Sequence, residues 1–186
     1  MSDGIIIALI AGSVALCVAY LNSFLAESFR RFRDGSTLAA SLAGELAAYE
    51  LAWPMIINMM DGIVKDIDSG RRNTKFLRPF EKPRDRVFED VVGKLGLLGV
   101  SLAENIVFVY GNIAAFRVAL EIIARDEKDM TDDELRARCI ACKDVVLRAV
   151  DRGTDLVVTL RDRAHQPFVP EWPWSAWLAF LGHHIV

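Results

Sequence analysis

Few residues in this chain of 186 have the types and spacing that catalysis or metal binding needs. Cys139-Ile-Ala-Cys142 has the spacing of a redox pair or of half a zinc site. The sequence offers no second Cys-x-x-Cys and no His-x-His pattern to complete a metal shell. Both cysteines also fall on one apolar helical stripe, where cysteine behaves as a small hydrophobe. We therefore expect them to pack inside a core.

The remaining motifs provide no catalytic constellation either. Gly93-Lys-Leu-Gly96 contains a Gly-Lys pair but lacks the Gly-x-x-x-x-Gly-Lys-Ser/Thr pattern that cradles phosphates, and together with Gly99 it predicts a tight turn. His165 has no neighbour in the sequence to orient it, and the adjacent histidines at 183 and 184 do not share one face of a helix. We expect no enzymatic activity, no metal and no cofactor. An enzyme with a thiol or zinc centre is the weakest alternative.

Positive charge is concentrated between two expected helices, in the connection at 69–100. Pro79 and Pro83 prevent a regular helix there, and up to position 86 only Glu81 and Asp85 oppose seven basic residues. Anionic lipid headgroups, nucleic acid, an acidic partner or solvent alone could account for this charge, although the near-neutral body gives no overall reason to expect nucleic acid. The candidate contacts for an anionic ligand or lipid are Arg71, Arg72, Lys75, Arg78, Lys82, Arg84 and Arg86.

An uncharged stretch of 23 residues, Gly4 to Ala26, opens the chain. As a helix, its length matches the roughly 30 Å hydrocarbon core of a bilayer. Inside that core an unpaired backbone N–H or C=O costs several kcal/mol, so we expect this segment to be a helix. Asp3 is the one charge before it, whereas Arg30, Arg31 and Arg33 follow it closely. Basic residues stay on the cytoplasmic side, so we expect the N-terminus outside, the body inside and these arginines at the membrane interface. A cleaved signal peptide is the alternative, although it needs a positive n-region.

The body is expected to be all-α, an antiparallel bundle with coiled-coil-like packing. Three segments carry apolar residues at alternating spacings of three and four, and none shows the two-residue alternation of a half-buried strand. The middle segment is apolar almost all round, so it is either the central helix or a contact with another subunit. The stripes are Ala39, Leu42, Leu46, Tyr49, Trp53, Ile56, Met60, Ile63 and Ile67; Leu102, Ile106, Val109, Ile113, Phe116, Leu120 and Ile123; and Leu135, Cys139, Cys142, Val146, Ala149, Gly153, Leu156 and Leu160.

Local signals set the expected helix ends. Ser36 is a candidate N-cap for the first body helix, and Pro54 predicts a kink or break near Trp53. Ser101-Leu-Ala-Glu104 and Thr131-Asp-Asp-Glu134 have the pattern of capping boxes for the other two. These boundaries divide the chain into an anchor with its basic flank at 1–33, a bundle at 34–165 and a tail at 166–186.

The tail holds three of the four tryptophans of the chain, Trp172, Trp174 and Trp177. Tryptophan is favoured at membrane–water interfaces, where the ring is buried and the N–H stays hydrated. The stretch is too short to span a bilayer. We expect it either to dock on the inner leaflet through these tryptophans or to cap a groove of the bundle.

The order of segments also resembles a known group. After an N-terminal span come Leu42-Ala-Gly-Glu-Leu46, then residues 87–98 (VFEDVVGKLGLL) and residues 102–110 (LAENIVFVY). This order is similar to that of small, mostly uncharacterised bacterial single-span membrane-anchored helical proteins. The resemblance implies a bacterial inner-membrane location and no defined activity.

Two functions follow as hypotheses. The first is a membrane-tethered helical interaction or scaffold protein, in contact with membrane lipids and acting as a homo-oligomer or as a subunit of a membrane complex. The alternative is a membrane-acting effector or sensor, whose basic loop binds an anionic ligand and whose spans perturb the bilayer. Small residues at four-residue spacing in the span, such as Ala11, Ala15 and Ala19, permit close packing of two spans.

Overall fold

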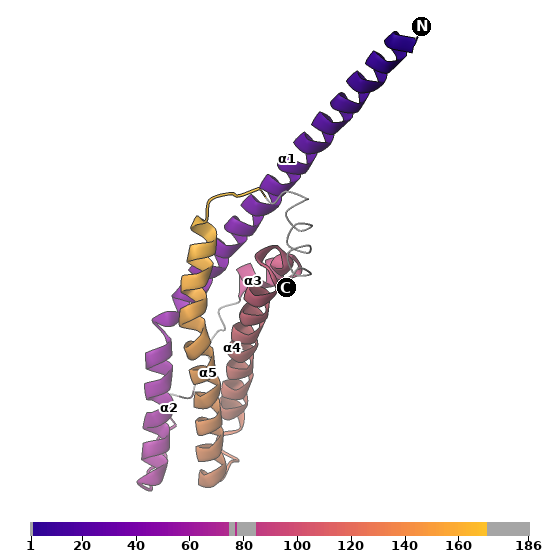
Figure 1. Cartoon of the computed structure of the whole chain (residues 1–186). Helices are drawn as coiled ribbons and strands as arrows, with labels where there is room; N and C mark the ends of the chain where they lie inside the picture. Colours follow the sequence, from indigo (N-terminus) through magenta and orange to yellow (C-terminus); the bar gives the residue numbers. More distant parts are fainter. Residues whose placement is uncertain (1, 75–76, 78–84, 171–186) are drawn as a thin grey trace, which may run out of the picture.

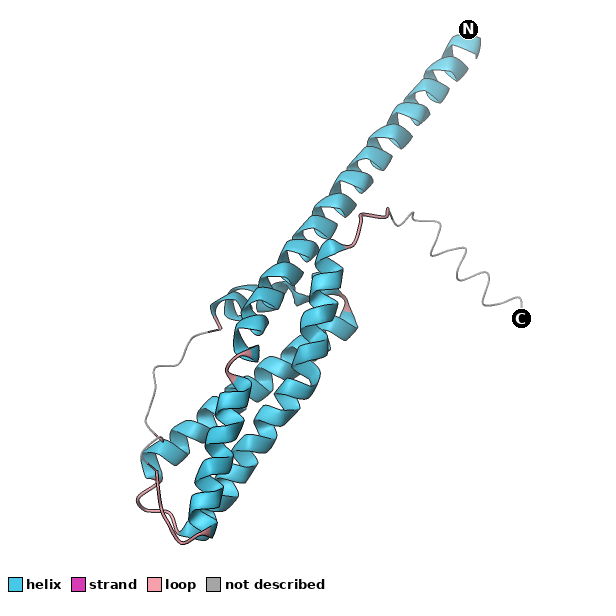
Figure 2. Ribbon diagram, turned by 90° about the vertical axis from the view of Figure 1, so that its left-hand side faces the viewer, coloured by secondary structure: helices cyan, strands magenta, loops and turns pink. Residues whose placement is uncertain are grey.

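The computed structural model describes residues 2–74, 77 and 85–170, and all secondary structure in these ranges is helical (Figure 2). The elements are α1 (Ser2–Glu50), α2 (Trp53–Asp68), α3 (Arg86–Val91), the 3-10 helix η1 (Val92–Leu98), α4 (Val100–Asp126) and α5 (Asp132–His165). The prediction of an all-α chain with a long apolar N-terminal helix is confirmed for these residues.

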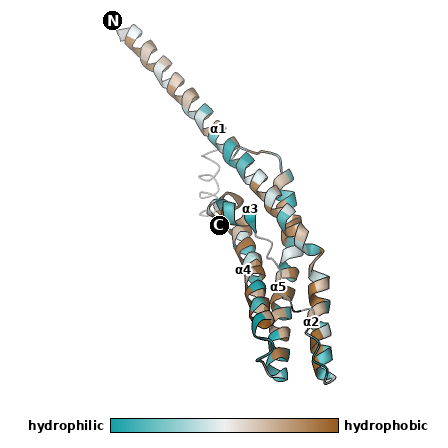
Figure 3. Ribbon diagram, turned by 180° about the vertical axis from the view of Figure 1, so that it is seen from behind, coloured by the Kyte–Doolittle hydropathy of each residue, from teal (hydrophilic) through white to brown (hydrophobic). Residues whose placement is uncertain are grey.

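Helix α1 is a single helix of 49 residues, about 75 Å long at 1.5 Å per residue. Its first half projects alone from the bundle and is coloured mostly in apolar shades (Figures 1 and 3). Side chains there are exposed, with Leu16 at 74%. The expected helix start at Ser36 is wrong, because α1 passes through this position without a break. The Ser36 hydroxyl instead accepts a hydrogen bond from Arg163 Nη1 of α5 at 3.3 Å.

The break near Pro54 is confirmed. Helix α1 ends at Glu50, and α2 begins at Trp53 with the proline in its first turn, where a missing N–H costs nothing. The apolar stripe resumes after the break, and Trp53, Met60 and Ile63 are buried. One hydrophobic face thus continues from α1 into α2 across a change of direction (Figure 1).

The core lies where α5 meets α1, α2 and α4. Every expected stripe position of α5, from Leu135 to Leu160, is buried, and on α4 all positions from Ile106 to Ile123 are buried. Helices α4 and α5 are antiparallel neighbours joined by a short turn, as predicted (Figure 1). Of the two alternatives for the middle body helix, the central position is wrong, because α5 contacts all three other long helices whereas α4 leaves one apolar face exposed. Contact of this helix with another subunit stays a prediction.

The connection at 69–100 is more regular than its prolines suggest. Helix α3 and η1 occupy its second half and pack against α1. The expected tight turn of glycines is wrong, since Gly93 and Gly96 belong to η1, and of these three glycines only Gly99, with φ of 87°, adopts a conformation that favours glycine. Gly99 is also the N-cap of α4, so Ser101 lies inside the first turn and makes no capping bond. The Thr131 cap is confirmed: its hydroxyl accepts from Glu134 N at 3.2 Å.

Candidate functional site

The interior holds a cluster of polar side chains that joins α1, α3 and α4. Glu45 of α1 points at the N-terminus of α3, where its two carboxylate oxygens accept hydrogen bonds from Val87 N at 3.0 Å and Phe88 N at 3.1 Å. Tyr110 of α4 donates its hydroxyl to the same carboxylate at 2.7 Å. The Phe88 ring stacks on the Tyr110 ring with centroids 4.0 Å apart. A carboxylate from one helix therefore caps another.

A second set of contacts fixes the residue before α3. Arg117 of α4 forms a two-pronged ion pair with Asp85, with Nη1 to Oδ2 at 2.6 Å and Nη2 to Oδ1 at 2.8 Å. The Tyr49 hydroxyl accepts from Arg117 Nη2 at 2.6 Å and donates to Asp85 Oδ1. The Tyr49 ring stacks on Trp53. Asp85 is buried, so this pairing supplies the compensation that a buried carboxylate requires.

The electrostatics of this cluster match its contacts. Burial, and then the hydrogen bond to Asp85, raise the pKa of Tyr49 to about 12. Burial and the hydrogen bond to Glu45 likewise raise the pKa of Tyr110. Burial disfavours the charge on Arg117, but its contacts with Asp85 outweigh this and raise the pKa of the guanidinium. Both tyrosines stay protonated and Arg117 stays charged at physiological pH. The named polar groups are all paired within the cluster, so it fastens α3 to the bundle and offers no free nucleophile.

The Cys139–Cys142 pair lies in the core, as the stripe predicted. Both side chains have no exposed surface, and burial raises the pKa of Cys139 to about 11 and that of Cys142 to about 12. A thiolate is the reactive form of cysteine, and it is suppressed here. Among the described residues, no group of three or more His, Cys, Asp or Glu side chains could hold a metal ion.

The candidate basic contacts of the loop are not brought together where they are described. Arg71 pairs with Asp66 at 3.3 Å, and Arg72 binds Asp132 at 2.9 Å as well as the carbonyl of Met130. Both closely follow the C-terminal end of α2, which lies at the end of the bundle farthest from the N-terminus (Figure 1), and Arg86 is exposed at the start of α3. Lys75, Arg78, Lys82 and Arg84 lie outside the described residues.

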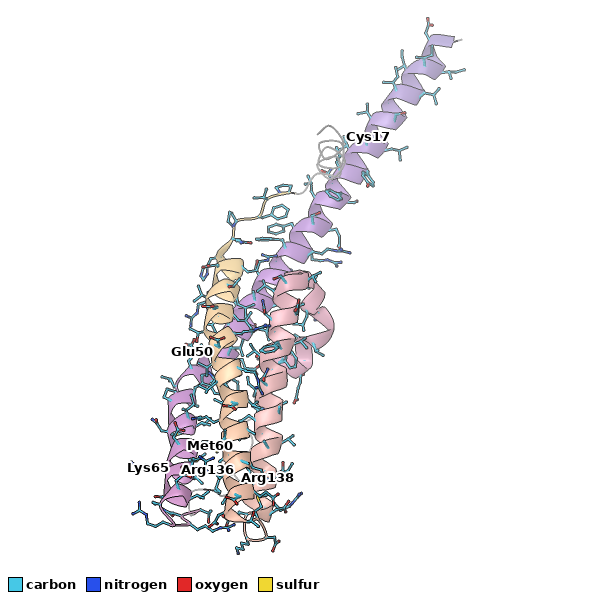
Figure 4. All side chains as sticks on the ribbon, turned by 60° about the horizontal axis from the view of Figure 1, so that its bottom comes forward. Cys17, Glu50, Met60, Lys65, Arg136 and Arg138 are labelled. Carbon is cyan, nitrogen blue, oxygen red and sulfur yellow. The ribbon has the colours of Figure 1, made fainter. Side chains whose placement is uncertain are left out.

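The far end of the bundle carries further surface ion pairs. Arg136 bonds Asp68 at 2.7 Å and Lys143 bonds Asp61 at 2.6 Å, which joins α5 to α2. Figure 4 places Lys65, Arg136 and Arg138 together at this end, with Cys17 on the projecting half of α1. Exposed pairs of this kind contribute little to stability and leave no concentrated free charge.

The opposite end, where α1 leaves the bundle, has a different character. A recess between α1 and η1 is lined by the three arginines expected at the interface, Arg30, Arg31 and Arg33, and by Lys94. Glu27 pairs with Arg30 at 2.7 Å and with Arg31 at 2.9 Å. The sequence analysis missed Lys94, because only the fold brings η1 beside α1. The one available signal was the Gly-Lys-Leu-Gly motif, which had been assigned to a turn.

The start of the tail returns to this same end. Phe168 packs against Phe29 and Phe32 of α1, with ring centroids 5.3 Å and 5.4 Å away. Arg163 lies over the Phe32 ring at 4.9 Å. The tail therefore departs from a position beside the first charged turns of α1. Trp172, Trp174 and Trp177 themselves lie outside the described residues.

Comparison with known proteins adds no family to this geometry. No protein-family model, no curated protein and no solved structure matches the chain. The resemblance to bacterial single-span proteins is thus supported at one level, that of a helical chain with one long apolar N-terminal helix.

Proposed function

We propose that this protein is a membrane-tethered helical interaction protein, anchored by Gly4–Ala26 and presenting its bundle on the cytoplasmic side of the membrane. The observation that carries the proposal is the continuity of α1. One helix has an apolar, wholly unburied first half and a second half that forms part of the bundle core. The same helix thus carries apolar side chains that need a hydrophobic environment outside the bundle and apolar side chains that pack into the bundle core.

The dimensions of α1 support an anchor. Its uncharged stretch is about 35 Å long at 1.5 Å per residue, enough to cross roughly 30 Å of hydrocarbon. The turns that follow are built into the protein: Phe29 and Phe32 contact Phe168, and Gly35 is buried. A helix that continues without a break into the core favours a retained anchor over a cleaved leader. It also makes the orientation of the bundle depend on that of the span.

The outer face of α4 supports the interaction role. Val107, Gly111, Ala114 and Val118 lie on it at spacings of four, three and four, and all four are exposed. The apolar groove beside them, about 500 Å³, is completed by Ala141 and Val145 of α5. This second seam repeats the spacing of the buried one, as expected of a helix that packs against a further partner. We infer that the protein self-associates through this exposed apolar face of α4.

Two measurements test the anchor. Alkaline carbonate should leave the protein in the membrane pellet, and protease added to intact spheroplasts should not cut the body. Recovery of a shortened chain in the soluble fraction would instead establish a cleaved leader.

A matched pair of variants tests the interaction surface. Val118 and Val158 are 55% and 53% exposed, on α4 and α5 respectively. Val118→Glu should reduce the mass of the detergent-solubilised particle, because a charge in an apolar seam opposes association, whereas Val158→Glu should not. A wild-type particle of monomer mass, or identical behaviour of the two variants, would reject self-association through this face.

A further inference from the structure

We propose that the recess between α1 and η1 binds the phosphate group of an anionic phospholipid, with Lys94 and Arg33 as its principal contacts. The inference rests on the proposed anchoring of α1, which sets the recess at the depth of the headgroups. It assigns a ligand to a site other than the basic loop at 69–86.

The recess is a cavity of about 910 Å³, large enough for a headgroup. One wall is α1 from Glu27 to Ser41, and the other is the end of α3 with η1, from Val91 to Leu97. Four cationic side chains and two anionic ones line it, so two positive charges remain uncompensated. The cationic residues are Arg30, Arg31, Arg33 and Lys94, and the anionic ones are Glu27 and Asp34.

The positive charges are unequally available. Glu27 engages both Arg30 and Arg31 in ion pairs, and the hydrogen bond from Arg31 is the largest cause that lowers the pKa of Glu27. Arg33 approaches Asp34 only to 4.0 Å, beyond hydrogen-bonding distance. Lys94 is exposed and has no hydrogen bond or ion pair with the described residues. Arg33 and Lys94 therefore retain donors for an external anion, and phosphate accepts both the arginine fork and the lysine point charge.

The recess lies at the right depth for a lipid. Its first lining residue, Glu27, directly follows the uncharged stretch. Residues 27–34 extend about 12 Å along the helix, comparable to the headgroup region beyond the hydrocarbon. Anionic headgroups give the cytoplasmic leaflet its negative surface potential, which favours basic residues placed here.

Two separate contacts hold η1 in place. A Cβ atom at Gly35 would lie 3.0 Å from the carbonyl oxygen of Leu97, so the absent side chain lets η1 approach α1 closely. Helix α3, which leads into η1, is capped by Glu45. Lys94 is thus presented by a fixed wall. Its charge lies 68 positions after Ala26 in the sequence and has no part in topology, which depends on residues within about 15–20 of the span.

The test compares Lys94→Gln with Lys128→Gln in the full-length chain solubilised in detergent. Both residues are exposed, but Lys128 lies in the turn between α4 and α5, at the other end of the bundle. Native mass spectrometry measures the affinity for short-chain phosphatidylglycerol, for the zwitterionic phosphatidylcholine of equal chain length, and for inorganic phosphate.

We expect wild type to prefer phosphatidylglycerol over phosphatidylcholine and Lys94→Gln to bind phosphatidylglycerol about fivefold more weakly, the factor that about 1 kcal/mol per basic residue provides. Lys128→Gln should bind as wild type does. Inorganic phosphate bound as tightly, with the same dependence on Lys94, would support the phosphate site and assign it to a soluble ligand. Equal loss in both variants, or no preference between the lipids, would overturn the proposal. Such a failure leaves carbonate extraction unchanged, so it is distinct from a failure of the anchor.

Discussion

Replacing Glu45 tests whether one carboxylate holds α3 in the bundle. Helix α3 has six residues, far fewer than the 12–15 or so at which an isolated helix becomes even marginally stable, so its existence depends on tertiary contacts. Glu45 supplies the acceptor for two of its first amides and for the Tyr110 hydroxyl. Glu45→Ala leaves all three donors without this partner, whereas Glu45→Gln keeps the shape of the side chain but removes the charge.

The magnitude follows from those three hydrogen bonds. Tyr110 is 2% exposed, and an unpaired buried hydroxyl costs about 1–3 kcal/mol. The amides of Val87 and Phe88 belong to half-buried residues and regain part of their bonding from water. Because hydrogen bonds to a charged group contribute more than neutral ones, we expect Glu45→Ala to destabilise the protein by about 2–4 kcal/mol and Glu45→Gln by about 1–2 kcal/mol.

Hydrogen exchange of the full-length chain in detergent is the most direct assay. Amides of residues 86–91 should exchange about five- to thirtyfold faster in Glu45→Gln, the factors that correspond to about 1–2 kcal/mol, while those in the middle of α5 stay protected. Glu104→Gln is the control: this residue is exposed on α4 and makes no hydrogen bond or ion pair with the described residues. Its effect should remain within about 0.5 kcal/mol.

Unchanged protection of α3 in Glu45→Gln would refute the reasoning, because stacking of Phe88 on Tyr110 would then suffice to hold the helix. Tyr110→Phe provides an internal check. It removes one of the three hydrogen bonds and keeps the ring stack, so its effect should be smaller than that of Glu45→Ala. A double-mutant cycle between the two positions should give a coupling energy of about 0.5–3 kcal/mol. A coupling near zero would show that the two side chains act independently.

Two further predictions concern α5 and the tail. Gly153→Leu should cost about 1–3 kcal/mol in thermal denaturation, because a Cβ there already meets an α4 side chain at 3.7 Å. Arg152→Ala should cost about 0.5–1 kcal/mol, because it removes the stacking of Arg152 on Phe108 at 4.1 Å. A larger effect at Arg152 than at Gly153 would contradict the close packing of α5 on α4 at Gly153. In a Trp53→Phe background, brominated lipids should quench the tail tryptophans, because Phe168 starts the tail beside the first charged turns of α1. Absence of quenching, with lower stability after deletion of 168–186, would place the tail on the bundle.

The helices and their core were predictable because burial repeats with the helical period. Each stripe position of α5 is buried. The proline of α2 and the threonine before α5 affect only the backbone hydrogen bonds in the first turn of their own helices, so the local sequence is enough to predict their effect. The failed predictions share a physical cause. Ser36 and Ser101 have the chemistry of caps, but whether a helix begins at a given hydroxyl depends on the neighbouring helices, and α1 continues through Ser36 because its next turns pack on α5 and η1.

Charge counts were weaker guides than periodicity. Seven basic residues in one loop suggested a ligand, yet Arg71 and Arg72 bind acidic groups and carbonyls of their own chain. The pairing could not be read from the sequence, because Asp132 lies 60 residues from Arg72. Lys94 is the opposite case. It is a single basic residue in a glycine-containing segment of the sequence, and it becomes part of a basic recess only because η1 packs on α1.

Helix α1 connects these features physically. Its successive segments would cross the bilayer, line the recess and, at Glu45 and Tyr49, hold the α3–η1 segment that carries Lys94. The apolar first half of α1 and the wall of the recess belong to one continuous helix, without an intervening loop. The paired charges of Asp85 and Arg117 secure the same segment from α4, so the wall that presents Lys94 is fixed from two helices. The buried polar cluster is thus better explained as the support of a surface site than as a reactive centre, because its named polar groups are already engaged and Lys94 lies on the wall that it supports.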